Sequence, residues 1–222
     1  SGHVRVYNWD GASWNQLGQD IDGEAAGDIS GTVSLSSDGS ILAVGAYGNN
    51  SSAGHVRIFN WDGNSWNQVG QDIDGESQDA SSGRSVSLSS DGNRVAIGTI
   101  RDDDAYSPNP GTVRLYDWDG VSWSQVGQDI NGQNDDQSGF SVSLSSNGNR
   151  VAIGTLYGNH TVLYSISYSS GSSCFGVVGA PKDPPSLRHA GRKLRLGCVP
   201  ASAIAADPQV AALRWLPVIR RG

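Results

Sequence analysis

Apolar side chains recur at every second position in short runs along the first 168 residues, which is the pattern of buried β-strands. In the first fifty residues it predicts four strands, at His3–Trp9, about Ser13–Leu17, Thr32–Ser36 and Ser40–Gly45. Asp-Gly pairs, which favour tight hairpin turns, separate the first two strands and the last two. Because no stretch before residue 169 has the period of a helix, we predict an all-β fold.

The strand pattern is repeated. A phrase of the type HVRIFNWDGNSWNQVGQDIDGE begins at His3, His55 and Thr112, and a second phrase of the type VSLSSDGNRVAIGT follows each copy. The copies begin 52 and 57 residues apart. Tandem units of about 50 residues with four antiparallel strands are typical of β-propeller blades. We therefore predict that residues 1–168 form about three blades of an open or partial ring.

The first strand of each unit has large side chains on both faces. In the first copy Arg5, Tyr7 and Trp9 share one face, and Val4 and Val6 share the other. Apolar groups on both faces favour a sheet that lies between two others. Arginine next to aromatic rings can place its guanidinium over a ring face. We interpret these aromatic residues as core and not as a sugar-stacking platform.

Charge divides the chain into two parts. Residues 1–168 contain 20 Asp and Glu, 7 Arg and no Lys, whereas residues 169–222 are basic and contain both cysteines and most of the prolines. We predict a domain boundary at residue 169. An acidic region without lysine argues against nucleic-acid binding. No stretch approaches the about 20 apolar residues of a membrane-spanning helix, so no membrane insertion is predicted.

Residues 169–222 allow three interpretations: a disordered basic tail, a small additional element, or a frame-shifted or misjoined translation. Cys174 and Cys198 would pair only in an oxidising compartment, and the repeat region contains no cysteine. A fourth copy of the first strand, TVLYSIS, starts at Thr161, but it lacks the arginine and the tryptophan. The chain begins within a repeat phrase, which we interpret as part of a longer reading frame.

The segments GFSVSLS at Gly139–Ser145 and VAIGT at Val151–Thr155, with VGAY at Val44–Tyr47, resemble the FG-GAP repeat of integrin α-chain propellers. The proline of the family's Gly-Ala-Pro element is missing, and Phe140 has no counterpart in the other copies. The resemblance implies a β-propeller, usually of about seven blades. It also implies an extracellular or cell-surface protein that acts in adhesion or ligand recognition.

Calcium is the first candidate cofactor, although we assign no metal, cofactor or catalytic residue. The acidic loop of FG-GAP blades is replaced here by the short turn Ser36–Gly39. Another acidic phrase contains Asp20 and Asp22 and recurs with Asp72 and Asp74. These carboxylates either share a calcium ion, which needs six to eight oxygen ligands, or form a solvated turn edge.

Three histidines, His3, His55 and His160, begin equivalent strands in different copies. We interpret them as strand-edge residues and not as zinc ligands, because they are far apart in the sequence.

The sequence therefore predicts a non-catalytic extracellular scaffold for binding or adhesion, with an unidentified protein or glycan ligand. The loops Tyr47–Gly54 and Ile100–Gly111 differ most between copies, so we expect specificity there. Three blades do not close a ring, so we expect further blades or self-association.

Two alternatives remain open. One is a fragment of a carbohydrate-active propeller enzyme, which needs two carboxylates ~5–10 Å apart. The other is a purely structural spacer in a large surface protein.

Overall fold

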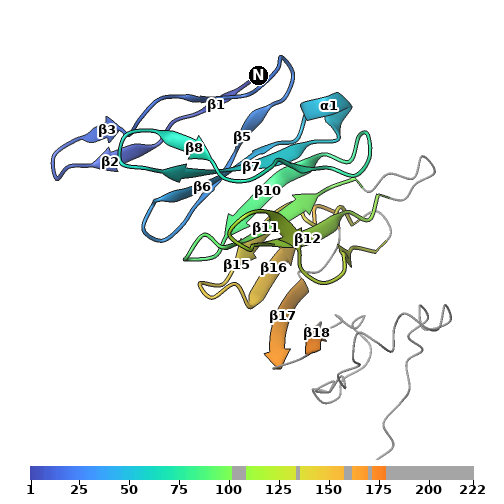
Figure 1. Ribbon diagram of the computed structural model, residues 1–222. Helices are drawn as coiled ribbons and strands as arrows, with labels where there is room; N and C mark the ends of the chain where they lie inside the picture. The colour runs from blue at the N-terminus through green and yellow to red at the C-terminus, as the bar shows by residue number, and fades with distance from the viewer. Residues whose placement is uncertain (102–108, 134–135, 158–161, 170–171, 179–222) are drawn as a thin grey trace, which may run out of the picture.

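The computed structural model describes residues 1–101, 109–133, 136–157, 162–169 and 172–178, and its regular structure is almost entirely β (Figure 1). The one helical element in these ranges is the turn α1 (Asn49–Ser52), which contains two residues with left-handed backbone angles. No helix in the described part of the chain has the length and hydropathy that a membrane span requires. The prediction of an all-β fold built from antiparallel sheets is confirmed.

Three larger sheets follow one another along the chain. The first contains, in order, β5 (Ser30–Leu35), β6 (Ile41–Ala46), β7 (His55–Trp61) and β8 (Trp66–Gln68), with β9 (Ile73–Asp74) on β7. The second repeats this order with β10 (Ser82–Leu88), β11 (Arg94–Thr99), β12 (Thr112–Trp118) and β13 (Trp123–Gln125), with β14 (Ile130–Asn131) on β12. The third contains β15 (Ser141–Leu144), β16 (Arg150–Gly154), β17 (Val162–Ser169) and β18 (Ser172–Val178).

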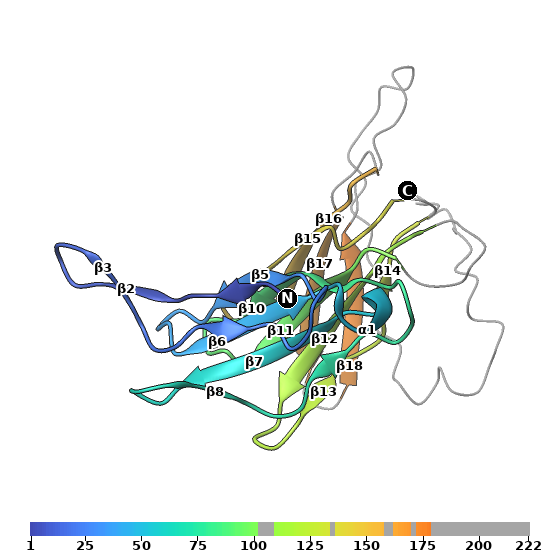
Figure 2. The same cartoon turned by 90° about the horizontal axis from the view of Figure 1, so that it is seen from above.

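The N-terminal copy forms two smaller pairs. Strand β1 (His3–Val4) pairs with β4 (Ile21–Asp22), and β2 (Tyr7–Trp9) pairs with β3 (Trp14–Gln16). The predicted strand His3–Trp9 is thus interrupted at its centre. In Figure 2 the hairpin β2–β3 extends away from the other strands.

The predicted strands are found within a residue or two, but they are grouped differently from the sequence repeat. Each large sheet joins the second phrase of one copy to the first phrase of the next, because β6 and β7 pair in unbroken register from Ile41↔Asn60 to Ala46↔His55. The acidic phrase, which we had not predicted to be a strand, forms β9 and β14 and pairs with the start of the neighbouring long strand. This pairing brings its carboxylates beside the first residues of β7 and β12.

Hydrophobic clusters fill the spaces between consecutive sheets. Alternate residues of β6 belong to different clusters. Leu42 and Val44 pack toward the N-terminal strands, whereas Ala43 packs toward the second sheet. A third cluster joins the second and third sheets through residues such as Leu115 and Ile153. This arrangement confirms that both faces of the first and second sheets contribute buried residues, as the two-faced strand pattern predicted.

The first strands of the sheets approach one another closely. The Thr32 hydroxyl donates a hydrogen bond of 2.6 Å to the Gly83 carbonyl, and Ser85 donates one of 2.8 Å to Gly139. A Cβ atom added at Gly45 would lie 2.2 Å from the same Gly83 oxygen. Glycine is required there because the neighbouring backbone occupies the space of a side chain.

No sheet among the described residues packs on the N-terminal flank. Val33 is 51% exposed, whereas Val86, at the same position of the next copy, is 9% exposed. Tyr7, Trp9 and Trp14 are also exposed. These exposures match the expectation that an open row of sheets leaves apolar side chains uncovered at its end.

Strand β18 continues the third sheet beyond the predicted boundary at residue 169, and its Cys174 pairs with Ser167 in register. Thr161, His160, Cys198 and most of the loop Ile100–Gly111 lie outside the described residues. The possible disulfide and the nature of residues 179–222 therefore stay predictions.

Candidate functional site between two sheets

A buried histidine lies at the centre of the candidate site. His55 is the first residue of β7, where it pairs with Ala46 of β6 and Asp74 of β9, and only 1% of it is exposed. Its Nδ1 lies 3.6 Å from Oδ2 of Asp72, while its buried Nε2 has no hydrogen-bond partner. A buried polar group without a partner costs ~1–3 kcal/mol of stability. Such a group calls for an explanation in function or in a missing ligand.

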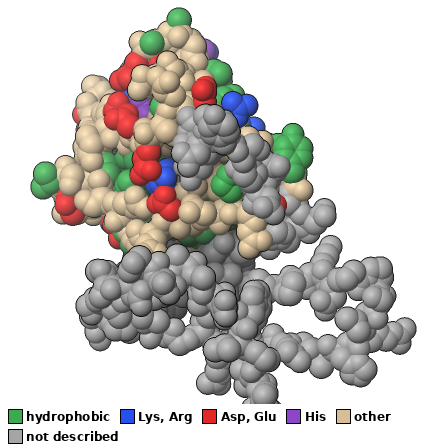
Figure 3. Space-filling view, turned by 90° about the vertical axis from the view of Figure 1, so that its right-hand side faces the viewer, with side chains coloured by type: hydrophobic (Ala, Val, Ile, Leu, Met, Phe, Trp, Pro, Cys, Tyr) green, Lys and Arg blue, Asp and Glu red, His purple; other side chains and the backbone are tan. Residues whose placement is uncertain are grey.

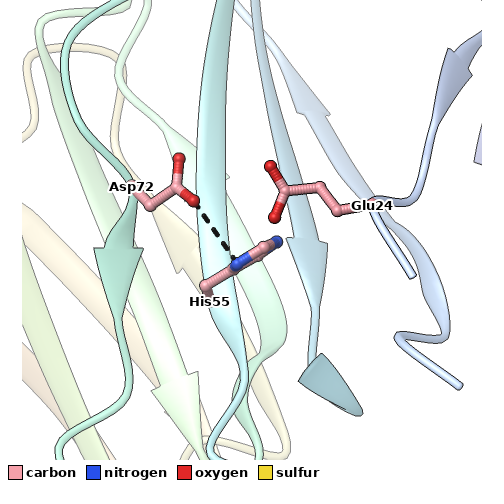
Figure 4. A group of neighbouring side chains, drawn as sticks. All are labelled: Glu24, His55 and Asp72. Carbon is pink, nitrogen blue, oxygen red and sulfur yellow. Dashed lines mark ion pairs between the residues drawn. The ribbon is translucent and has the colours of Figure 1, made fainter. Parts of the chain in front are cut away.

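Two carboxylates from different repeat copies flank this imidazole. Asp72 precedes β9 of the same sheet, and Glu24 follows β4 in the N-terminal copy. Figure 4 shows the ring between them, with Nδ1 on the Asp72 side and Nε2 on the Glu24 side. One ligand-type atom from each of the three residues lies within 4.8 Å of the other two. The carboxylates are partly exposed, so the group is open to solvent on their side.

Arg57, two residues further along β7, completes the polar site. Its Nη1 lies 3.6 Å from Oε1 of Glu24, and its Nη2 donates a hydrogen bond of 2.7 Å to the Asp22 carbonyl. Its Nε is buried and has no partner. The guanidinium carbon lies 5.4 Å from the ring centre of Phe59, so the predicted contact between arginine and the aromatic face is confirmed in this copy.

The next interface contains the same positions with a different pattern of contacts. Thr112 stands where His55 stands and donates a hydrogen bond of 3.0 Å to Asn131. Arg114 binds both Asp129, at 2.7 Å, and Glu76, at 2.8 Å. Burial lowers the pKa of Arg114, but the hydrogen bond to Asp129 and the charges of both carboxylates outweigh this effect and raise it.

The Asp129 carboxyl responds in the opposite sense. Burial raises its pKa, but the hydrogen bonds from Arg114 and Gln125 and the Arg114 charge lower it more, so that it lies below its ordinary value. This interface is therefore a satisfied charge network. The corresponding carboxylate of the first interface, Asp72, instead faces His55 and accepts a hydrogen bond of 2.6 Å from Gln68.

The four aspartates considered for calcium are not brought together. Asp20 binds Arg5 and Gln16, and these contacts lower its pKa to about 2. Asp22 and Asp74 lie exposed on β4 and β9. Asp72 alone joins a group of metal-ligand type in the described residues, and its companions are Glu24 and His55.

Figure 3 shows acidic side chains gathered on one face of the molecule, beside a histidine and a basic side chain.

Sequence reasoning placed His55 correctly at the start of a strand but missed its burial. It missed Glu24 because this residue acts across the boundary between two copies. The available signal was the exchange of histidine for threonine at position 112, in a phrase that is otherwise repeated closely.

Comparisons with known proteins support the fold only. No protein-family model matches the chain, and no curated protein sequence is significantly similar to it. A solved protein from Bacteroides uniformis, named “putative 6-phosphogluconolactonase”, aligns with a TM-score of 0.55 and 14% identity over 78% of this chain and 47% of its own. A protein of the same name from Bacteroides fragilis aligns with a TM-score of 0.48 and 16% identity, over 69% and 39% of the two chains.

The first of these likenesses shows a β-propeller-like fold, and this chain spans about half the length of that neighbour. The predictions of a non-catalytic adhesion scaffold and of a chain that is not an enzyme are corrected, because a fold of this kind also occurs in a protein named as an enzyme. Those predictions inferred a function from the fold. The correction has a physical reason, because a fold positions side chains but does not determine their chemistry. The resemblance to FG-GAP repeats and the extracellular location stay predictions.

Proposed function

We propose that this chain is a segment of a β-propeller hydrolase that opens a sugar-type lactone without a phosphate group. In this proposal each four-stranded sheet is one blade, and additional blades or further copies complete the ring. The observation that carries the proposal is the convergence of Glu24 and Asp72, from two repeat copies, on buried His55, whose Nε2 has no hydrogen-bond partner. The likeness in fold to a protein named as a lactonase supports the choice of reaction class.

The third copy indicates that the fold does not require a histidine at the position of His55. Thr112 occupies the same position, is buried, and satisfies its hydroxyl with Asn131. Threonine at position 55 would therefore fit the same strand pairing without an orphaned ring nitrogen. A residue that lowers stability, at a position where another residue would fit without this loss, is typical of functional sites.

Lactone hydrolysis needs groups that the site contains. Water adds to the carbonyl carbon, the ring carbon–oxygen bond breaks, and the products are a carboxylic acid and a hydroxyl, without any redox partner. The carboxylates and the imidazole supply a base for the proton that the attacking water loses. The carboxylate product would be repelled by Glu24 and Asp72, which favours its release.

The charge of the site favours a substrate without phosphate. The repeat region contains no lysine, and the nearest cation, Arg57, lies beside Glu24 and binds a backbone carbonyl. Arg114 at the next interface already binds two carboxylates. Recognition of a phosphate usually uses arginine or lysine that is free to form charge-assisted hydrogen bonds.

A glycosidase is supported less well. Its two carboxylates must stand on either side of a scissile bond. Here an oxygen of Glu24 lies within 4.8 Å of an oxygen of Asp72, and the His55 ring lies beside both (Figure 4). This separation is shorter than the ~5 Å or more that the two carboxylates of a glycosidase need.

The test measures acid release from a neutral aldonolactone and from 6-phosphogluconolactone by the full chain. The variants are His55→Thr and, as a matched control, His3→Thr at the exposed equivalent position. We expect hydrolysis of the neutral lactone above the buffer rate, lost in His55→Thr and kept in His3→Thr. No acceleration, or equal rates in wild type and His55→Thr, would overturn the proposal. Faster hydrolysis of the phosphorylated lactone would overturn the substrate class.

A further inference from the structure

Glu24, His55 and Asp72 together have the composition of a metal site. The ring nitrogens of His55 lack the hydrogen bonds that would explain the group in another way. The ring nitrogen Nε2 is buried without a partner, although a carboxylate stands on its side of the ring (Figure 4). The other nitrogen is 3.6 Å from Asp72, which is longer than a hydrogen bond. The three ligand-type atoms nevertheless lie within 4.8 Å of one another. They surround a common point without bonding to each other.

The repeats provide an internal comparison for this arrangement. In the third copy, which has threonine in place of histidine, Arg114 holds both Asp129 and Glu76 with contacts of 2.7 and 2.8 Å. In the second copy, Arg57 reaches only Glu24, at 3.6 Å, and turns its other nitrogen to the Asp22 carbonyl. In the first copy, by contrast, His3 is exposed and Arg5 binds Asp20 at 2.7 Å. Among the described copies, the buried histidine is therefore the one beside which two carboxylates lack a close arginine contact, and these carboxylates are available to a cation.

We infer that Glu24, His55 and Asp72 bind one divalent transition-metal ion of the Zn²⁺ type. One imidazole nitrogen and two carboxylate oxygens form a donor set that zinc accepts, and three protein ligands leave a position for water or substrate. Calcium is a poor occupant, since it prefers six to eight oxygen ligands and an imidazole contributes none. The acidic phrase therefore contributes to a metal site, but with a partner and an ion different from those considered in the sequence analysis.

The fold suits this role. His55 is held by strand pairing on both sides, with Ala46 and Asp74, so its ring is fixed within the sheet. Asp72 is oriented by the Gln68 amide, and Glu24 by Arg57. Such outer contacts orient metal ligands and tune their basicity. The partly exposed carboxylates leave an entry path from solvent.

This inference shares its site with the proposed function, which the metal would serve by lowering the pKa of a bound water. The two fail separately, because metal binding is measured without any lactone. A chain that binds zinc at His55 but hydrolyses nothing would refute only the hydrolase. A chain that hydrolyses lactones equally after removal of metal would refute only the metal's part in the reaction.

The experiment is calorimetric titration of the chelator-treated full chain with ZnCl2. Two variants remove ligands, His55→Thr and Glu24→Gln, and Glu76→Gln serves as the control because it stands at the equivalent position of the next interface. We expect one zinc ion bound through these residues, an affinity about 10-fold or more lower in both ligand variants, and no change in Glu76→Gln. Titration with CaCl2 is expected to give no comparable heat.

Cobalt supplies a second measurement. Co²⁺ bound at His55 should show visible absorption bands of a low-coordinate site, and these bands should disappear in His55→Thr. The inference is overturned if zinc does not bind, or if it binds equally to His55→Thr. It is also overturned if NMR shows a proton on both nitrogens of His55 that zinc does not displace, since a plain ion pair with Asp72 and Glu24 would then explain the group.

Discussion

The indole Nε1 of Trp66 donates a hydrogen bond of 3.0 Å to the backbone carbonyl of Leu17, 49 residues earlier in the chain. Trp123 repeats the contact with the Val69 carbonyl at 3.1 Å. Both tryptophans are buried, whereas Trp14, at the same position of the first copy, is 66% exposed. The second tryptophan of each phrase therefore joins one repeat copy to the copy before it.

Trp66→Phe should destabilise the protein by ~1–3 kcal/mol, because it removes an inter-sheet hydrogen bond and leaves a carbonyl without its donor. Trp14→Phe is the matched control and should change stability by less than ~0.5 kcal/mol, as is usual for exposed positions. Urea denaturation followed by circular dichroism measures both. Equal losses in the two variants would contradict the inter-sheet role of Trp66.

Gly70→Ala should cost more than Gly63→Ala, although both glycines have positive φ. A Cβ at Gly70 would lie 2.6 Å from the Trp118 ring, whereas at Gly63 it would meet nothing within 4 Å. We expect ~1 kcal/mol for Gly63→Ala, from backbone strain alone, and ~2–3 kcal/mol for Gly70→Ala. Thermal unfolding of the two variants compares them. A Gly70→Ala protein as stable as Gly63→Ala would show that the Trp118 ring can move aside.

Arg114→Met should destabilise the interface between the first and second sheets by ~1–3 kcal/mol, because Asp129 and Glu76 then lose their shared cation. Arg5→Met, at the equivalent position, should destabilise the protein less, since Arg5 is 44% exposed and binds Asp20 near solvent. Denaturant midpoints measure the difference. Equal shifts in the two variants would show that solvent screens the Arg114 network as fully as it screens the Arg5 pair.

We predict that the stability of the turn at Asp10 depends on pH. Hydrogen bonds from the backbone N–H groups of Ser13 and Ala12, and then from the Ser13 hydroxyl and Asn15, lower the pKa of Asp10 to about 2. Because the folded-state pKa lies below the ordinary value of 3.8, the turn is stabilised above about pH 4. This stabilisation is lost as the pH falls toward 2.

NMR titration of the Asp10 carboxyl should find a midpoint near 2. Ser13→Ala should raise it only slightly, since the backbone donors contribute most. A midpoint near 3.8 in the wild type would contradict the hydrogen bonds of the turn.

The repeat phrases by themselves determined the strands and the two-faced burial of the sheets, because both depend on local alternation of side chains and on Asp-Gly turns. The strands predicted at Thr32–Ser36 and Ser40–Gly45 were found close to their predicted bounds for this reason. The sequence also showed that threonine, at position 112, stands where the preceding copy has His55. It did not show the consequence of this difference, because both residues fit the same strand position.

Only the tertiary structure decided how the strands are grouped and which side chains meet. The sheets combine the end of one copy with the start of the next, so Glu24 comes to lie beside His55 and Asp72 although two strands and 30 residues separate it from His55. Such a contact depends on packing between sheets, which the pattern within a single strand does not contain. For the same reason, burial separates His55 from the exposed His3, although the two begin the same phrase.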